Sequence, residues 1–448
     1  MPTHSVPLES TPPEAHLLDP VYFGTDVSTP LVMIFTTQRW FSAARLAMAF
    51  ASAGARVHLL SPPRHPAMLT TSIHTHHQFR ALHPLRSILD CIRSFGPDLV
   101  VPTDDTAVGY LHRLYNQAHR LDPELAPALR SLLARSLGDP ACFPILDSRT
   151  CLLKAAREEG ILVPPTALIS SATSLRDWLA HNPLPAVLKA DGTSGGEGVE
   201  IVTTEKQAFH AWRRLRTPLG LARAAKKAGF EHDANHLLPW LMRRPRQVSI
   251  QSFVHGRDAN MAVACWQGEL LGAVTLDVLH TWRPKGPSAL VQLMHNDSMF
   301  AAARSLARRL HLSGFYGLDF IVESAPPDQP RSVPRAWLIE VNARATQTCH
   351  LPYGTPHDLV PTLVAALASR PLPAPNHAAQ RGIIALFPLA WQAGLSRQLL
   401  DSATQDIPYD EPLLAKAGLA LPRESAYERW KRLWTRAATP HSLPGEIQ

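Results

Sequence analysis

Short apolar runs alternate with helical periodicity along the first hundred residues. Residues 31–35, 56–60 and 98–102 predict buried strands, and residues 40–53 and 85–95 place apolar side chains at helical spacing. A strand, a helix and a second strand follow one another within about 30 residues, which is typical of a βαβ unit with parallel strands. The N-terminal part is therefore expected to be an α/β domain.

Polar residues follow the third of these strands. Thr103, Asp104 and Asp105 could line a pocket, because ligands of parallel sheets tend to lie beyond the carboxyl ends of the strands. A helix cap and turn is the interpretation that we favour for Asp105. No G-x-G-x-x-G motif follows the first strand, which argues against a nicotinamide cofactor.

Four histidines cluster in a segment without clear periodicity, namely His74, His76, His77 and His83. A metal site would require them to converge with a carboxylate or a thiolate. We favour a mobile, exposed loop for this segment.

A glycine-rich hairpin is predicted after a helix at residues 147–159, a strand at 166–169 and a helix at 174–181. Within residues 185–202, an apolar strand ends at Lys189 and a polar, glycine-rich loop leads to a second strand. Glycines expose backbone N–H groups to phosphate oxygens, and a lysine adds positive charge. The spacing is not that of a P-loop, so the segment alone fits phosphate binding and an ordinary hairpin equally well.

An antiparallel sheet is predicted farther along the chain. Its strands are residues 248–254, 259–266, 270–279, 315–322 and 337–344, and a helix at 296–310 separates the third strand from the fourth.

The last strand carries Glu340, Asn342 and Arg344 at alternate positions, so all three side chains point to one face. Asp319 lies on the preceding strand. Carboxylate and amide oxygens suit Mg²⁺, and a guanidinium suits a phosphate or an acyl-phosphate oxyanion. These two strands therefore predict a site for a metal–phosphate complex.

Composition excludes several classes of function. The 448 residues carry a net charge of +7, but Lys and Arg are dispersed outside any nucleic-acid-binding motif, so no nucleic acid is expected as a partner. Five cysteines without a C-x-x-C pair indicate a reducing compartment, and we expect a cytoplasmic protein. No apolar run is long enough to span a bilayer, and residues 1–29 lack the apolar region of a signal peptide.

The order of these parts resembles the ATP-grasp superfamily over residues 31–367. The resemblance is carried by the βαβ start, Lys189 with its glycine-rich loop, the strand with Gln251, and the D…E-x-N-x-R face. It implies an α/β and α+β multidomain fold, in which a parallel pre-ATP-grasp domain precedes a two-subdomain ATP-grasp fold and a small C-terminal extension. The implied ranges are 1–29 for a Pro-rich disordered arm, 30–145 for the pre-ATP-grasp domain, 146–254 for the lid subdomain, 255–370 for the subdomain with the metal site, and 371–448 for the extension.

Residue by residue, the resemblance implies a site for ATP and Mg²⁺ or Mn²⁺. The implied phosphate contacts are Lys189, Arg149 and the lid-loop residues Thr193, Ser194, Gly195 and Gly196. The implied adenine contacts are Gln251 and the backbone of Ser252, Phe253 and Val254, and Asp258 is the implied ribose contact. The implied metal ligands are Asp319, Glu340 and Asn342, and the implied catalytic residues are Arg344, which steadies an acyl-phosphate, and Lys189.

Two positions depart from the family pattern: Arg149 replaces a common lysine, and Gly317 replaces an arginine of some relatives. Because no metal ligand is lost, the resemblance implies an active ligase that releases ADP and joins a small carboxylate to an amine. A carboxylase-type enzyme and a nucleotide-binding protein without turnover are the alternatives, although the chain lacks the A-M-K-M motif of a biotinyl carrier. Family members are often dimers, so a homodimer is compatible with the resemblance; a membrane is not expected as a partner.

Overall fold

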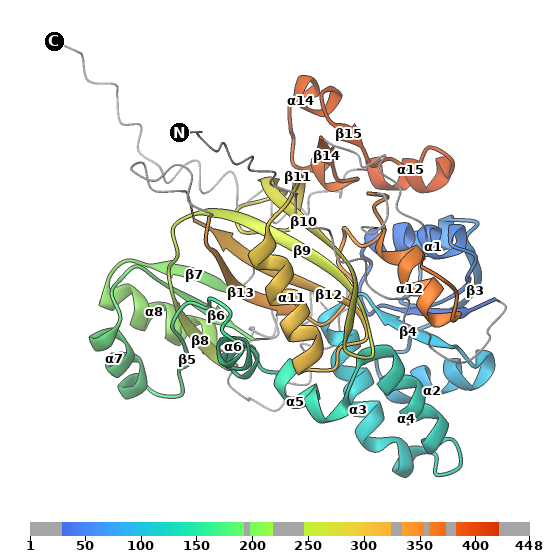
Figure 1. Ribbon diagram of the computed structural model, residues 1–448, viewed down its shortest axis with the longest axis horizontal. Coiled ribbons are helices and arrows are strands. Elements are labelled where there is room, and N and C mark those ends of the chain that lie inside the picture. The colour runs from blue at the N-terminus through green and yellow to red at the C-terminus, as the bar shows by residue number, and fades with distance from the viewer. Residues whose placement is uncertain are drawn as a thin grey trace, which may run out of the picture.

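The computed structural model describes residues 29–191, 198–217, 246–323, 334–353, 358–372 and 382–420. They form a parallel sheet, an antiparallel sheet and a larger mixed sheet, with helices packed around them (Figure 1). This arrangement confirms the predicted α/β and α+β multidomain fold. Among these residues, no helix is both long enough and apolar enough to cross a membrane.

The N-terminal part is a parallel sheet with the strand order β3–β2–β1–β4. Its strands are β1 (Leu31–Phe35), β2 (Arg56–Ser61), β3 (Ile73–Gln78) and β4 (Leu99–Pro102); its helices are α1 (Ser42–Ser52), α2 (Pro84–Phe95), α3 (Asp105–Leu121), α4 (Ala126–Leu137) and α5 (Phe143–Leu146), with 3-10 turns at η1 (Pro66–Leu69) and η2 (Pro140–Cys142). Val32 and Ile34 pack into one core, and Met33 and Phe35 pack into the core on the other side. Burial of both faces explains why β1 is a continuous apolar run.

The histidine-rich segment is a strand, so the prediction of a mobile, exposed loop was wrong. His74, His76 and His77 lie on β3, which pairs in parallel with β2 at the edge of the sheet. His76 Nε2 lies 3.1 Å from Ser61 Oγ, and the ring of His77 packs against Phe95. An edge strand is held by its partner strand and stays polar, so its own sequence lacks the apolar alternation of a half-buried strand.

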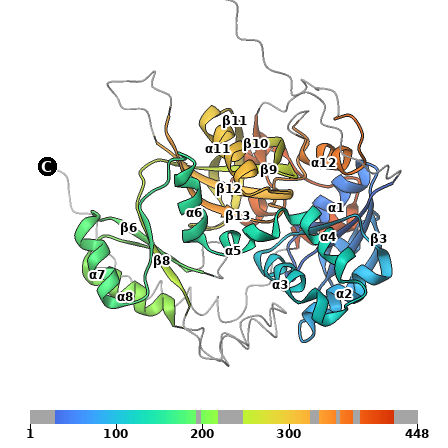
Figure 2. The same cartoon turned by 60° about the horizontal axis from the view of Figure 1, so that its bottom comes forward.

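The second sheet is antiparallel, with the strand order β5–β8–β6–β7. Its strands are β5 (Thr166–Leu168), β6 (Ala186–Ala190), β7 (Val199–Val202) and β8 (Val248–Ser252), and the helices of this region are α6 (Arg149–Glu158), α7 (Ala172–His181) and α8 (Glu205–Arg216). Strands β6 and β7 form the predicted hairpin. Figure 2 shows this sheet, together with α7 and α8, on the opposite side of the third sheet from β1–β4.

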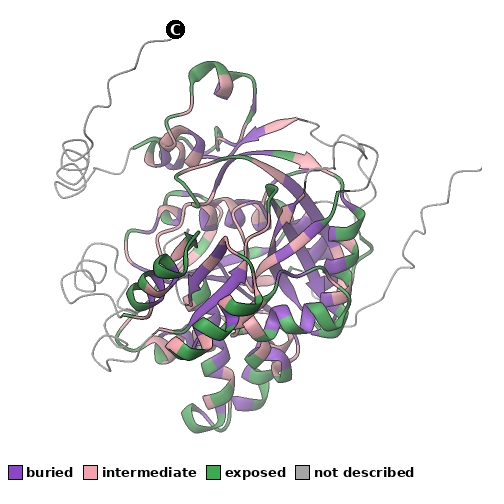
Figure 3. Ribbon diagram, turned by 90° about the vertical axis from the view of Figure 1, so that its left-hand side faces the viewer, coloured by how far each residue is buried: buried purple, intermediate pink, exposed green. Residues whose placement is uncertain are grey.

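The third and largest sheet has the strand order β13–β12–β9–β10–β11–β14–β15. The elements before the C-terminal extension are β9 (Arg257–Trp266), β10 (Glu269–Thr281), β11 (Ser288–Met294), α11 (Asp297–Arg309), β12 (Gly314–Val322), β13 (Ala336–Asn342) and α12 (Leu359–Leu367). Helix α11 packs against one face and α12 against the other, so the strands are largely buried (Figure 3). Strand β11 was not predicted, because its short apolar run follows a loop broken by Pro and Gly.

The C-terminal extension adds the elements β14 (Ile383–Ala385), α13 (Leu389–Gln392), α14 (Arg397–Asp401), β15 (Thr404–Gln405) and α15 (Pro412–Leu419). Strand β14 pairs with β11, so the extension packs against the third sheet. Buried Asp406 accepts hydrogen bonds from Arg45 Nη2 at 2.6 Å and His350 Nε2 at 2.9 Å. This ion cluster ties the extension to α1 and to the loop after β13. Residues 426–437, whose sequence pattern predicts a further helix, lie outside the described residues.

Candidate functional site

A pocket of about 400 Å³ is lined by residues of the second and third sheets and by residues that follow β1 and β4 of the first sheet. Eleven residues singled out from the sequence line it: Arg149, Lys189, Gln251, Ser252, Phe253, Val254, Asp258, Asp319, Glu340, Asn342 and Arg344. The lid-loop residues Thr193, Ser194, Gly195 and Gly196 lie outside the described residues. Elements that are distant in the sequence therefore bring the predicted residues to one cavity.

Asp319 is the weaker acid of a facing carboxylate pair. Strands β12 and β13 place it directly opposite Glu340. Its Oδ1 accepts a hydrogen bond from Asn260 Nδ2 at 2.5 Å, and its Oδ2 accepts one from Asn342 Nδ2 at 3.1 Å. Burial, together with the negative charge of Glu340, raises the pKa of Asp319 to about 6. A cation between the two carboxylates would relieve this repulsion.

Arg149 contacts two carboxylates. It begins α6, where the Ser148 side chain caps the helix. Its Nη1 lies 2.9 Å from Asp191 Oδ1, and its Nη2 lies 2.9 Å from Glu340 Oε1. Burial alone would raise the pKa of Glu340, but Arg149 and Lys189 hold this pKa below its usual value. Glu340 therefore stays ionised.

Lys189 faces the carboxylate pair from the second sheet. Its side chain is buried, and Nζ donates a hydrogen bond to the carbonyl of Ile339 at 3.2 Å. Burial lowers the pKa of Lys189, although the negative charge of Glu340 opposes the shift. The lysine thus brings the end of β6 against β13, directly beside the acidic pair.

The other end of the pocket has apolar walls and a polar edge. Val187 and Ile201 pair across β6 and β7, and Ile201 is 44% exposed. Buried Gln251 donates from Nε2 to Thr166 Oγ1 at 3.1 Å. The amides of Ser252 and Phe253 donate to the carbonyls of prolines 165 and 185, which fixes this backbone. Such a slot can accept a flat ring with hydrogen-bonding atoms along one edge.

Arg344 reaches toward the N-terminal sheet. Its Nε donates to Asp105 Oδ1 at 2.8 Å, and its Nη2 donates to Asn342 Oδ1 at 3.3 Å. The cap that we favoured for Asp105 belongs instead to Asp104, which accepts a hydrogen bond from the Ala107 amide at the start of α3. Asp105 lies in the first turn of α3 and lines the pocket. The interpretation was wrong because Arg344, which pairs with Asp105, is remote in sequence.

Two further residues of this region were not singled out from the sequence. Asn260 lies two residues after Asp258 on β9, and Asp191 lies two residues after Lys189. Alternation along a strand could have placed each of them on the same side as the residue already singled out. The structure also explains why position 317 is a glycine, because a Cβ atom there would overlap Cγ2 of Thr346.

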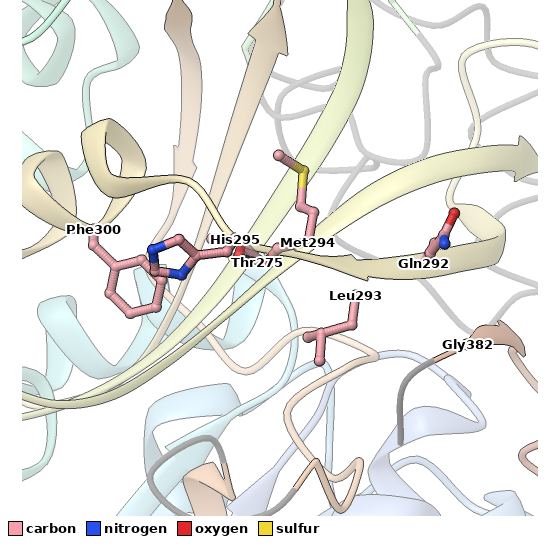
Figure 4. Close-up of a pocket in the computed structure, with 7 residues that line it drawn as sticks. All are labelled: Thr275, Gln292, Leu293, Met294, His295, Phe300 and Gly382. Atoms are coloured by element: carbon pink, nitrogen blue, oxygen red, sulfur yellow. Dashed lines mark hydrogen bonds between the residues drawn. The ribbon is translucent and has the colours of Figure 1, made fainter. Parts of the chain in front are cut away.

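A second pocket, of about 510 Å³, lies near the start of α11 (Figure 4). Its lining residues are Thr275, Gln292, Leu293, Met294, His295, Phe300 and Gly382. The rings of His295 and Phe300 lie 5.7 Å apart, and His295 pairs with the exposed Asp297. This lining contains no opposing carboxylates or buried lysine, so the first pocket is the candidate site.

The first pocket fits a hard cation only together with a ligand. The part of the chain that the structure describes holds no group of three or more His, Cys, Asp or Glu side chains that could bind a metal ion. A cation would depend on Asp319, Glu340, the amide oxygen of Asn342 and oxygens of the ligand. Mg²⁺ is bound in this way, by one or two carboxylates together with substrate phosphates.

No family model and no curated protein matches the chain. An N5-carboxyaminoimidazole ribonucleotide synthetase solved as an ADP complex is 15% identical, with a TM-score of 0.55 over 81% of this chain and 82% of that chain. An N5-carboxyaminoimidazole synthetase from Staphylococcus aureus, also with ADP, is 12% identical, with a TM-score of 0.54 over 83% and 82%. The biotin carboxylase domain of 2-oxoglutarate carboxylase from Hydrogenobacter thermophilus, solved with MgADP and bicarbonate, is 13% identical, with a TM-score of 0.52 over 78% and 73%. At these identities, the similarity establishes the fold.

Proposed function

Since the chain has the ATP-grasp fold, we propose that it is an ATP-dependent ligase that joins a small carboxylate to an amine and releases ADP. The observation that carries the proposal is the convergence on one pocket of an acidic pair, Asp319 and Glu340, with three basic side chains, Lys189, Arg149 and Arg344. Solved structures of this fold with ADP in place support the nucleotide.

The proposal implies one orientation of the nucleotide in the pocket. Its base lies over Val187 and Ile201, with Gln251 and the following backbone at its edge, and Asp258 accepts hydrogen bonds from the ribose. Its phosphates point to the basic side chains at the other end of the pocket. Asp319, Glu340 and Asn342 hold Mg²⁺, which neutralises phosphate charge when it is bound.

The reaction has two steps. A carboxylate oxygen attacks the γ-phosphorus, the bond from this phosphorus to the β–γ bridging oxygen breaks, and ADP leaves. Arg344 stabilises the oxyanion of the acyl-phosphate that forms. The amine nitrogen then attacks the acyl carbon and loses a proton, and phosphate leaves with the former carboxylate oxygen. Neither step requires a side-chain nucleophile.

Bicarbonate is an alternative carboxylate substrate. A biotin carboxylase domain of this fold was solved in complex with MgADP and bicarbonate, and the E-x-N-x-R pattern at Glu340, Asn342 and Arg344 is compatible with either substrate class. In that case, the first product is carboxyphosphate, and the acceptor takes a carboxyl group.

Product analysis with a matched pair of variants tests the proposal. Purified protein is incubated with Mg²⁺, ATP and pools of carboxylic acids, bicarbonate and amines, and ADP, AMP and condensed products are measured by mass spectrometry. Glu340→Gln removes the charge in the pocket, whereas Glu323→Gln changes a carboxylate that pairs with Arg335. Pool-dependent ADP is expected from the wild type and Glu323→Gln but not from Glu340→Gln. AMP as the product, or undiminished ADP from Glu340→Gln, would refute the proposal.

A further inference from the structure

Arg149 and Glu340 form a hydrogen bond with each other, although the proposed function gives each of them a different partner. Arg149 is expected at the phosphates and Glu340 at the metal, yet Arg149 Nη2 donates to Glu340 Oε1 at 2.9 Å. The Arg149 side chain is only 13% exposed, so the contact belongs to the interior of the pocket. A guanidinium on this carboxylate occupies one of the two oxygens that could bind a cation.

Arg149 also has a second anionic partner, Asp191, which directly follows β6. Asp191 Oδ1 accepts from Arg149 Nη1 at 2.9 Å. The backbone of Asp191 is fixed independently, because its amide donates to the carbonyl of Gln247 at 3.0 Å. Asp191 follows Lys189 by two residues, at the start of the glycine-rich loop. It can therefore hold the arginine while Glu340 changes partner.

We propose that Arg149 exchanges Glu340 for nucleotide phosphates when the site fills, and that Asp191 is the positioning residue that keeps Arg149 in place during this exchange. Glu340 then binds the cation. The inference rests on the proposed function of the pocket. It assigns a role to Asp191, and it explains the use of an arginine at position 149.

Charge balance explains why ligand binding would separate Arg149 from Glu340. Before ligands bind, the positive charge of Arg149 compensates Glu340, and a divalent cation competes with it for the same carboxylate. Phosphates offer Arg149 a replacement partner, so nucleotide binding frees Glu340 and cation binding frees Arg149. Each ligand therefore strengthens the binding of the other by the same factor. An arginine suits this role because its planar fork can hold two oxyanions at once, whereas a lysine is a single point charge.

The first test separates metal affinity from nucleotide affinity. Binding of Mn²⁺ alone is measured by electron paramagnetic resonance, and binding of the fluorescent analogue mant-ADP is measured in EDTA and in Mn²⁺. Arg149→Met is expected to tighten Mn²⁺ binding about fivefold, to weaken mant-ADP binding about tenfold, and to reduce the coupling between the two ligands. Lys154→Met, an exposed change on the same helix, is expected to alter none of these values. Weaker binding of Mn²⁺ alone by Arg149→Met would overturn the exchange.

The second test concerns Asp191. Asp191→Asn is expected to weaken binding of Mn²⁺–mant-ADP about tenfold and to leave mant-adenosine, which has no phosphates, unaffected. Asp191→Glu, which keeps the charge, is expected to restore part of the affinity. An equal loss for mant-ADP and mant-adenosine would instead mean that Asp191 only maintains the fold of the pocket, and would overturn its positioning role.

Binding to the wild-type protein separates a failure of the proposed function from a failure of the exchange. Absence of binding for both Mn²⁺ and mant-ADP would overturn the proposed function together with the exchange. Binding of both ligands without coupling, and without opposite shifts in Arg149→Met, would overturn the exchange and leave the nucleotide site standing.

Discussion

Asp319→Asn is expected to stabilise the metal-free protein at neutral pH, although it removes a proposed metal ligand. The pKa of Asp319 rises from 3.8 to about 6 on folding, and each unit corresponds to about 1.4 kcal/mol, which gives about 3 kcal/mol in total. The folded carboxyl binds its proton more tightly than the unfolded one, so the wild type loses this stability as the pH rises from about 4 to 6. The neutral variant avoids the loss.

The expected gain is smaller than the full shift. The single oxygen of the introduced amide can still accept from Asn260, but its NH₂ group faces the NH₂ group of Asn342, which leaves one donor unsatisfied. A net gain of about 1–2 kcal/mol above pH 7 is therefore expected, because an unsatisfied donor costs about 1–3 kcal/mol.

Urea unfolding in EDTA, followed by circular dichroism between pH 4.5 and 8, measures this gain. The difference between variant and wild type is expected to grow with pH and to level off above about pH 7, and Asp410→Asn, an exposed change, is expected to show no such trend. Added Mg²⁺ is expected to stabilise the wild type but not the variant, because the variant lacks a proposed metal ligand. A difference that is independent of pH, or that turns against the variant as the pH rises, would refute the electrostatic reasoning.

Three further changes test other parts of the molecule. Lys189→Met is expected to weaken mant-ADP binding at least about tenfold, since a charge-assisted hydrogen bond is lost, with circular dichroism unchanged. Asp406→Ala leaves two buried basic side chains unpaired, and the free energy of unfolding in urea is expected to fall by about 3–5 kcal/mol. Gly317→Ala is expected to cost about 1–3 kcal/mol through overlap with Thr346, and the double variant with Thr346→Ser, which lacks the methyl group concerned, should recover most of this stability.

Alternation along single strands was enough to predict much of the site. Glu340 and Asn342 share a face because they are two residues apart, and Asp319 faces them because its strand pairs antiparallel with theirs. The buried strands of the first sheet were predicted for a similar reason, since their apolar runs are continuous. In each case, the deciding pattern lies within a few residues.

Features that depend on distant partners were missed. The pairs Arg344–Asp105 and Arg149–Glu340 join positions 239 and 191 residues apart, and no local pattern marks either pair. Strand β3 was mistaken for a loop because its pairing with β2, rather than its own composition, makes it a strand. Charge compensation inside a pocket depends on the tertiary structure. The sequence therefore predicted individual residues of the candidate site but not the ion pairs between them.

The most direct test of the central claim follows an oxygen atom. Carboxylate pools, including bicarbonate, are labelled with heavy oxygen and incubated with the protein, Mg²⁺, ATP and amines, and the released phosphate is analysed by mass spectrometry. Transfer through an acyl-phosphate predicts ADP together with phosphate that carries one heavy oxygen from the carboxylate. Unlabelled phosphate, or AMP with pyrophosphate, would contradict the account.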